Sequence, residues 1–327
     1  MTEFELIAKY FTRSTPGALI GNGDDAAVVA PREGHAFVIT TDTLIESRHY
    51  LPTLDPMKLG RRLAHVNLSD LAAMGATPRF ATLSLTLPNI DDTWVDRFAQ
   101  GLWSALDAHS VELIGGNTTR GQTSLSMTAI GEVSVVSGRA MALTRGGARA
   151  GDELWVSGSL GDAGWALYCM TGVIAADASR EQIDAYEMPT ARVRLGLALQ
   201  NLASSCIDVS DGLLSEANHL AQASNVAFEI DFSQIPSTLK PMLIDPKLSA
   251  QATHCLLATG DAYELLFTVP RERHEEVATL LRTHELAGDC IGRAVPVSLN
   301  DLGSRVRVLD ASGHAMDARL SGWDHFA

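Results

Sequence analysis

Paired cysteines, positive charge and long apolar runs are scarce in this chain of 327 residues, and each scarcity excludes a class of protein. The four cysteines lie far apart with no Cys-x-x-Cys pair, and the ten histidines form no His-Glu-x-x-His, which excludes the common zinc and redox motifs. We expect the cysteines to be buried free thiols. No apolar run approaches the roughly 20 residues of a membrane span, and the first residues lack the features of a signal peptide, which predicts a cytoplasmic protein.

The charge balance limits the possible partners. The chain has 25 lysines and arginines against 39 aspartates and glutamates, a net charge of −14. Such a chain repels nucleic acid and anionic membranes, so we expect neither as a partner. It would also repel a phosphorylated substrate unless divalent cations neutralised the binding site.

Length and hydrophobic pattern predict two domains, each mixing helices and strands, with the turn-rich basic segment 144–152 as the boundary. We therefore place the domains at residues 1–144 and 145–327, and the mixture predicts an α/β or α+β fold class. The strands expected are 26–30, 36–41, 80–87, 111–114, 124–133, 153–157, 226–231 and 263–269. The helices expected are 4–11, 56–75, 92–109, one from about 162, 190–203, 212–224 and 271–284.

Aspartates stand at the ends of apolar strands or in glycine turns at five places. Each one alone is explained as an ordinary turn or cap residue, but five clusters in an acidic chain favour a common function. Carboxylate oxygens suit Mg²⁺, which typically takes one or two protein carboxylates together with substrate phosphates. Magnesium ions would also remove the repulsion between this chain and a phosphorylated substrate. The ligands indicated by this argument are Asp25, Asp42, Asp70 and Asp208.

Asp70 is the most informative of these aspartates. It continues the apolar stripe Leu59, Leu63, Val66 of the expected helix 56–75, so we expect it to be buried. Burying an unpaired carboxylate costs several kcal/mol, which favours a metal ligand; a buried, hydrogen-bonded aspartate is the alternative.

Common nucleotide-binding motifs are absent. The chain has neither a Gly-x4-Gly-Lys-Ser/Thr loop nor the protein-kinase motifs. Two glycine segments stay open. Residues 158–164 precede a helix and either cradle a phosphate or form a tight strand-to-helix connection. Residues 115–120 either bind a phosphate through backbone N–H groups or form a plain turn.

An ordered series of motifs resembles the thiamine-monophosphate kinase family. The motifs are GDDAA at 23–27, TTDTL at 40–44, NLSDLAAMGA at 67–76, GGNTTR at 115–120, DVSDGL at 208–213, YELLF at 263–267 and GWDHF at 322–326. The resemblance runs from about residue 4 to residue 326, and jointly the motifs are highly specific.

The resemblance implies a fold, an activity and a set of site residues. The fold is that of the aminoimidazole ribonucleotide synthetase superfamily, with two α/β domains and a homodimer formed through the first. The activity is transfer of the γ-phosphoryl group of ATP to thiamine monophosphate, giving thiamine diphosphate, with no general base assigned. The first domain would bind ATP and Mg²⁺, and the second would complete the nucleotide and substrate site. Magnesium positions match Asp25, Thr40, Thr41, Asp42, Asp70, Asp208 and Asp211; nucleotide contacts match Gly116, Asn117, Arg145 and Ser210; positions facing thiamine match His49, Asp261 and Trp323.

The chain departs from the family pattern at three positions. Many relatives have Asp where Asn117 stands, and an amide is the weaker metal ligand. In the family's usual Gly-Gly-Glu-Asp-Tyr-Glu-Leu segment, Asp261 is one methylene shorter than Glu, and Ala262 has no carboxylate.

Other readings stay open. His49 is alternatively a surface histidine, Trp323 a residue that fastens the C-terminus, and Arg145 a solvated linker residue. A rival activity is another ATP-dependent reaction of the superfamily, such as selenophosphate synthesis, which favours a reactive cysteine near the N-terminus, whereas the first here is Cys169. A second rival is a non-catalytic, metal-stabilised nucleotide sensor.

Overall fold

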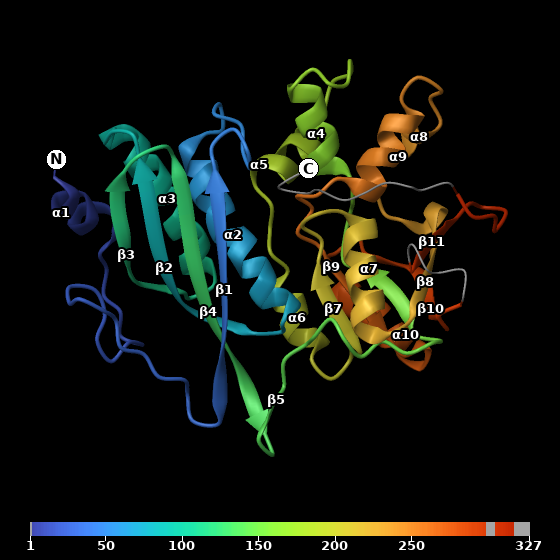
Figure 1. Ribbon diagram of the computed structural model, residues 1–327, viewed down its shortest axis with the longest axis horizontal. Coiled ribbons are helices and arrows are strands. Elements are labelled where there is room, and N and C mark those ends of the chain that lie inside the picture. Colours follow the sequence, from blue (N-terminus) through green and yellow to red (C-terminus); the bar gives the residue numbers. More distant parts are fainter. Residues whose placement is uncertain (1, 299–304, 317–327) are drawn as a thin grey trace. The chain divides into compact units, whose positions relative to one another are not determined.

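The structure is a computed structural model that describes residues 2–298 and 305–316, in which the chain forms two compact units (Figure 1). Unit 1 consists of Met1–Leu71 and Ala76–Ala142, and unit 2 consists of Ala72–Gly75 and the chain from Leu143 onward. The division after Ala142 lies close to the boundary expected at residue 144.

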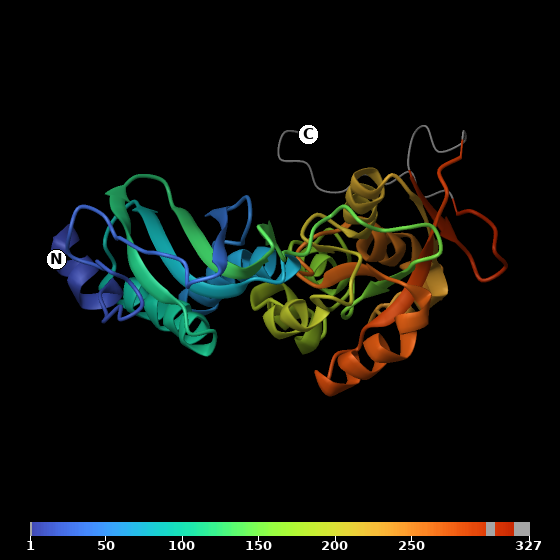
Figure 2. The same cartoon turned by 90° about the horizontal axis from the view of Figure 1, so that it is seen from below.

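Unit 1 is a mostly antiparallel sheet with two long helices on one face (Figure 1). The strand order is β1-β4-β2-β3, β5 pairs with β4, and the β2–β3 pair is parallel. Figure 2 shows α3 on one side of this sheet. The elements are α1 (Glu3–Leu6), the π-helix η1 (Ile7–Phe11), β1 (His35–Ile45), α2 (Pro56–Ala73), β2 (Thr77–Leu87), α3 (Asp92–Ala108), β3 (Glu112–Arg120), β4 (Ser124–Val136) and β5 (Arg139–Ala140).

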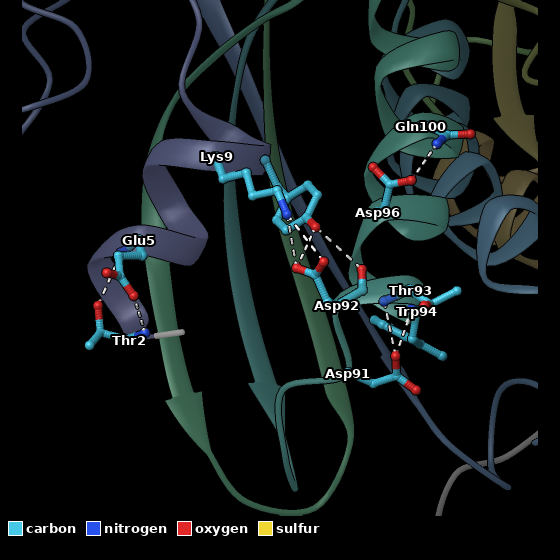
Figure 3. A network of polar contacts seen from close by, with 10 residues as sticks. Thr2, Glu5, Lys9, Asp91, Asp92, Thr93, Trp94, Asp96 and Gln100 are labelled. Carbon is cyan, nitrogen blue, oxygen red and sulfur yellow. Dashed lines mark hydrogen bonds and ion pairs between the residues drawn. The ribbon is translucent and has the colours of Figure 1, made fainter.

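Local sequence explains where the two long helices of unit 1 begin. The Asp55 carboxylate accepts the N–H of Met57 (2.9 Å) just before α2, and Pro56 occupies the first helical position, where its missing N–H costs nothing. The Asp91 carboxylate accepts the N–H of Thr93 and caps α3 in the same way (Figure 3).

Glycines allow α2 and α3 to approach closely. A Cβ on Gly60 would lie 2.0 Å from the Phe98 carbonyl oxygen, and one on Gly101 would lie 1.7 Å from the Met57 carbonyl oxygen. The two helix backbones therefore touch where a side chain would separate them. This crossing fixes α2, the helix that carries Asp70.

The N-terminal helix is fastened to α3 through one carboxylate. Lys9 Nζ lies 3.1 Å from both Asp92 oxygens (Figure 3), and the Tyr10 hydroxyl donates to the same group at 2.6 Å. The Trp103 indole N–H donates to the Tyr10 carbonyl oxygen at 2.8 Å. The first segment thus packs against α3.

Unit 2 is a six-stranded mixed sheet in the order β11-β8-β10-β6-β9-β7. Every residue of β7 and β9 is buried, so both faces of the sheet are covered there. Figure 2 shows α7 on one side of the sheet and α10 on the other. The elements are β6 (Glu153–Val156), α4 (Asp162–Met170), α5 (Arg180–Glu187), α6 (Val193–Leu199), β7 (Ser205–Asp208), α7 (Leu213–Ser224), β8 (Ala227–Asp231), η2 (Phe232–Gln234), α8 (Lys240–Leu243), α9 (Ser249–Ala258), β9 (Leu265–Val269), η3 (Arg271–Arg273), α10 (His274–Thr283), β10 (Asp289–Val295) and β11 (Val306–Leu309).

Most expected elements are present, with two corrections. The strand expected at 26–30 is wrong, because this stretch belongs to a largely exposed loop in which Val28 bridges Ile20. The turn considered at 115–120 is also wrong, because β3 continues through it to Arg120.

The expectation of buried thiols holds for two of the four cysteines. Cys206 and Cys255 are buried, whereas Cys169 and Cys290 are partly exposed, and all four are free. Among the described residues, no helix is both long and apolar enough to cross a bilayer.

Candidate functional site

In unit 1, the structure brings Thr40, Asp42 and Asp70 to the same side of strand β1. The Thr40 hydroxyl donates to the Asp70 carboxylate, and the Asp42 N–H donates to the Asn67 side-chain oxygen at 3.1 Å. Asn67 and Asp70 lie about one turn apart on α2. Strand β1 and the last turns of α2 are therefore tied together by oxygen-bearing groups.

Thr41 points the other way. Successive side chains alternate across a strand, and Thr41 is exposed while its neighbours are partly buried. Its hydroxyl donates to the Met127 carbonyl oxygen at 3.1 Å and accepts from Thr128 at 3.2 Å. The Thr41 side chain therefore belongs to the open face of the sheet, away from Asp42 and Asp70.

Asp70 is partly buried, so the expectation of a fully buried carboxylate is wrong in degree. The reason is that α2 is buried almost all round, including the polar residues Asn67 and Ser69, so its apolar stripe does not mark a single buried face. Asp70 does accept a hydrogen bond, from the Thr40 hydroxyl, as the alternative interpretation expects. This bond leaves a role as metal ligand open to the carboxylate.

Asp25, Gly116 and Asn117 lie apart from this group. Asp25 stands in an exposed loop, and the neighbouring Asn22 amide donates to the Leu113 carbonyl oxygen in β3 at 2.8 Å. Gly116 aligns with Asp42 across the sheet, three strand spacings away, which is about 14 Å. A single ion does not span that distance.

Glycine is required at position 116 in β3. A Cβ there would lie 1.8 Å from the Leu83 carbonyl oxygen, and φ is +153°. Gly116 and Asn117 are exposed on the edge strand of the sheet. Their position leaves one side of β3 open to a ligand.

His49 lies in the turn that follows β1. Its Nδ1 accepts the N–H of Ile45 at 3.0 Å, so in the neutral ring the proton is on Nε2. The residue is partly buried rather than a freely solvated surface histidine. The bond fixes the ring at the end of the strand that carries Thr40 and Asp42.

In unit 2, Asp208 ends strand β7 and begins an acidic loop that reaches Gly212. Asp208 itself is 5% exposed, whereas Ser210 and Asp211 are partly exposed. A second loop, 259–264, runs alongside: the Asp261 N–H donates to the Ser210 carbonyl oxygen at 2.9 Å, and the Tyr263 N–H donates to the Val209 carbonyl oxygen at 2.8 Å. The residues expected to bind metal and those expected to face the acceptor are therefore backbone neighbours in this unit.

Glu216 is a member of this cluster that sequence reasoning missed. It is 3% exposed, and its Oε1 accepts the Asp211 N–H at 3.2 Å. Burial raises the pKa of Glu216 to about 8; the Asp211 N–H and Arg145 oppose this shift, and the charges of Asp208 and Asp211 add to it. In the sequence this glutamate looks like an ordinary acidic residue in the first turn of a helix, so nothing there indicates that it is buried beside Asp211.

The backbone of Arg145 is fastened to the end of α7. The Ser224 hydroxyl at the end of α7 donates to its carbonyl oxygen at 3.1 Å and accepts the Gly147 and Ala148 N–H groups. The Arg145 side chain is exposed, and its charge is among the influences that lower the pKa of Glu216. Segment 145–148 is thus fastened to unit 2.

The glycine turn 158–164 is a tight strand-to-helix connection. A Cβ on Gly158 would lie 2.5 Å from the Glu264 carboxylate, and one on Gly164 would lie 2.0 Å from the Thr259 hydroxyl oxygen. Protein atoms, rather than a phosphate, occupy the space that these glycines leave. Of the two readings of this turn, the structural one is favoured.

The donor chemistry fits a hard cation. The grouped side chains offer carboxylate and hydroxyl oxygens, which are the ligands of Mg²⁺. Within residues 2–298 and 305–316, no three His, Cys, Asp or Glu side chains gather around one point. Each ion would therefore take one or two carboxylates and complete its shell with water or substrate oxygens, the pattern that Mg²⁺ prefers. Trp323, expected to face thiamine, lies outside the described residues.

Comparison with known proteins covers the whole length of the chain. The family model of AIR synthase related protein, N-terminal domain, matches residues 23–133, and that of the C-terminal domain matches residues 149–301. Thiamine-monophosphate kinase of Haemophilus influenzae is 36% identical over 332 residues, covering 100% of this chain and 98% of the relative.

Solved structures give the same picture. Thiamine-monophosphate kinase from Stenotrophomonas maltophilia K279a has a TM-score of 0.81 and 37% identity, covering 96% of each chain. A structure named "AaThiL complexed with AMPPCP and TMP" has a TM-score of 0.74 and 32% identity, covering 99% of this chain and 96% of the other. These similarities include both units and every motif region that the structure describes.

Proposed function

This chain belongs to the AIR synthase related family and, within it, to the thiamine-monophosphate kinases, and from that premise we propose that it phosphorylates thiamine monophosphate with ATP, giving thiamine diphosphate. The observation that carries the proposal is the likeness to thiamine-monophosphate kinases from end to end. A relative that binds AMPPCP and TMP supports both substrates. The acidic loop of unit 2 and, in unit 1, the aspartates of β1 and α2 each supply oxygen donors of the kind that this reaction needs.

We assign the binding roles to residues of both units. In unit 1, Thr40, Asp42 and Asp70 are tied together by hydrogen bonds, and in unit 2 Asp208 and Asp211 share the acidic loop. Bound Mg²⁺ would supply positive charge that neutralises the transferring phosphoryl group. The full set proposed for magnesium is Asp25, Thr40, Thr41, Asp42, Asp70, Asp208 and Asp211, and the set for ATP is Gly116, Asn117, Arg145 and Ser210.

Thr41 and Asn117 have narrower roles in this proposal. Since the Thr41 side chain lies on the open face of the sheet, its contribution to the Asp42 side is through the backbone carbonyl oxygen. Asn117 offers an amide in place of a carboxylate and suits a nucleotide contact better than a metal ligand.

No general base is needed for this reaction. A phosphate monoester has a second pKa near ~6, so the acceptor phosphate is largely a dianion at neutral pH and needs no proton removed. Kinases that phosphorylate a hydroxyl differ, because there an aspartate accepts the proton. His49, fixed by its bond to Ile45, therefore binds and orients the acceptor.

The acceptor-facing set is His49, Asp261 and Trp323. Position 262 shows how the departure from the family pattern is accommodated: Ala262 packs against the hydrophobic core of unit 2. A carboxylate there would lie against apolar side chains, so the alanine suits its surroundings.

The test is the dependence of ADP formation on the acceptor. We expect ADP and thiamine diphosphate in equal amounts from ATP, Mg²⁺ and thiamine monophosphate, and little ADP with other phosphorylated acceptors of a small panel. ADP formation that ignores thiamine monophosphate would contradict the proposal, and binding without turnover would indicate a nucleotide sensor. We further propose that the enzyme works in the cytoplasm as a homodimer, as the family resemblance implies.

A further inference from the structure

Two residues of the loop 259–264 adopt a backbone conformation that side chains other than glycine rarely take. The φ of Asp261 is +66° and that of Tyr263 is +51°. Aspartate tolerates this region better than most residues, but tyrosine does not, and such strain persists only where the surroundings enforce it. Strained residues of this kind concentrate at functional sites.

The loop is held in this conformation by its neighbours. Its N–H groups at Asp261 and Tyr263 donate to the acidic loop, and the Val209 N–H donates back to the Glu264 carbonyl oxygen at 2.8 Å. A Cβ on Gly260 would lie 1.9 Å from the Ser210 carbonyl oxygen, so the two loops are in direct backbone contact.

The loop is also anchored at its last residue, Glu264. The buried Glu264 carboxylate accepts from Arg192 Nε at 2.8 Å and from the Ser157 hydroxyl. A charge-assisted pair in a buried place holds its partners in one geometry. The backbone at Tyr263 is therefore fixed on both sides.

This backbone directs the Tyr263 side chain toward Asp261. The Tyr263 hydroxyl donates to Asp261 Oδ1 at 3.3 Å, two residues away in the chain. A phenol donor sets the direction of a carboxylate without removing its charge. The strained conformation thus serves a specific contact between two side chains.

We propose that Tyr263 is a positioning residue for the acceptor, acting through Asp261, an inference that rests on the proposed function. A carboxylate repels the phosphate of thiamine monophosphate, so Asp261 serves the positively charged thiamine part. Tyr263 holds that carboxylate in the direction the acceptor requires. Since ATP does not share this contact, Tyr263 affects the acceptor alone.

The decisive variant is Tyr263→Phe, which keeps the ring and the backbone and removes the hydroxyl. We expect the KM for thiamine monophosphate to rise about fivefold, the size of the net contribution of one ordinary intramolecular hydrogen bond. The KM for ATP and kcat should stay unchanged, and Tm should fall no more than in the control variant below. Tyr168→Phe is the matched control, because its hydroxyl makes a bond of the same length, 3.3 Å to His254, elsewhere in unit 2; it should leave the acceptor KM unchanged.

The role through Asp261 is tested in a second background. Glycine suits a positive φ, so Asp261→Gly removes the carboxylate without adding strain. In that background Tyr263→Phe should have no further effect on the acceptor KM. An equal fivefold effect there, equal rises in both KM values, or a drop in Tm with Tyr263→Phe clearly larger than with Tyr168→Phe would overturn the inference. Failure of the proposed function shows separately, as wild-type protein that forms no ADP in response to thiamine monophosphate, and the inference falls with it.

Discussion

Glu132 in unit 1 and the acidic loop of unit 2 give buried carboxylates opposite surroundings. In unit 1, Glu132 on β4 is 1% exposed and bonded to two arginines, to Arg32 Nε at 2.5 Å and to Arg79 Nη1 at 2.8 Å. Burial opposes its ionisation, yet the hydrogen bonds from Arg32 and the charges of Arg79 and Arg32 outweigh it and hold the pKa of Glu132 below its ordinary value.

In unit 2, by contrast, the buried carboxylates Asp208 and Glu216 are neighbours of another carboxylate, Asp211, and the pKa of Glu216 is raised to about 8. A carboxylate neutralised by the protein's own arginines stabilises the fold. A group of carboxylates that repel one another costs stability and suits an external cation. This difference in surroundings, rather than burial alone, supports the proposal that the acidic residues of unit 2 bind a cation.

The largest expected effect is on activity and comes from Asp208→Asn. Loss of one carboxylate that would hold the metal should lower kcat/KM about 10³-fold, since a metal ion contributes several kcal/mol to charge stabilisation. The Tm of the metal-free protein should be unchanged or higher, because one of several like charges is removed. The measurement is a coupled ADP assay with melting curves; Asp289→Asn, an exposed aspartate of β10 in the same unit, is the control. Near-normal turnover at saturating Mg²⁺ would show that Asp208 is not a ligand.

The next effect is on stability and comes from Glu132→Gln. Breaking a buried ion pair leaves arginine charges without their partner, and we expect the free energy of unfolding to fall by about 3 kcal/mol. Urea denaturation measures it. Asp107→Asn, which removes a half-exposed bond to Arg13, should change little. If Glu132→Gln is as mild as Asp107→Asn, the structural half of the comparison fails.

The contributions of Glu132 and Glu216 to folding stability should also change with pH in opposite directions. The lowered pKa of Glu132 gives stability that is present above its unfolded pKa and lost as acid protonates the folded protein. Glu216 holds its proton in the folded metal-free protein but not in the unfolded chain between pH 4.5 and about 8, so its contribution to stability falls as pH rises through that window.

Glu216→Gln tests this sign, because the amide resembles the protonated carboxyl. With EDTA present, we compare the free energy of unfolding of the variant with that of wild type. The difference in favour of the variant should grow by about 1 to 2 kcal/mol as the pH rises from 6.5 to 8.5. Denaturation at several pH values gives the difference directly. A difference that does not vary with pH would mean that Glu216 is ionised throughout.

The smallest expected effect comes from His49→Asn, which tests whether His49 acts as a general base in the reaction. His49→Asn should raise the acceptor KM several-fold, while the shape of the kcat–pH profile stays the same. Asparagine Oδ1 keeps an acceptor for the Ile45 N–H, so the turn is preserved. Mg²⁺ must be saturating, because protonation of aspartate ligands also lowers activity in acid. An acidic limb that is present in wild type and lost in the variant would identify His49 as a base.

Hydrophobic periodicity was sufficient to predict the long elements of unit 1. Helices α2 and α3 and strands β1, β2 and β4 lie close to their expected ranges, because each combines a clear period with a capping residue or a run of β-formers. Some short elements were not predicted: α9 begins at Ser249 without a side-chain cap, and β10 and β11 are held in place by pairing with β8, which no local pattern encodes.

The candidate site was predicted only in part. Asp208 stood out because it ends an apolar run and Asp211 because it precedes Gly212. Glu216 and Tyr263 did not stand out, since their significance depends on partners that the fold brings close. The position of Asp70 on the apolar stripe of α2 predicted full burial, whereas the residue is partly buried. The prediction failed because α2 is surrounded by other elements, so its stripe does not mark a single buried face. The residue types of the site were legible in the sequence, whereas their hydrogen bonds and charges required the structure.

The central claim is that arginines neutralise Glu132 whereas the acidic loop of unit 2 serves an external cation. The most direct test is the rise of Tm when Mg²⁺ and a non-hydrolysable ATP analogue are added. This rise is compared in wild type, Asp208→Asn and Glu132→Gln. A ligand that binds only the folded state stabilises it by RT ln(1 + L/Kd), which grows with the free ligand concentration L relative to Kd. We predict a rise of several degrees in wild type, an equal rise from a lower baseline in Glu132→Gln, and a much smaller rise in Asp208→Asn. An equal rise in all three proteins would contradict the claim that the acidic loop of unit 2 serves an external cation.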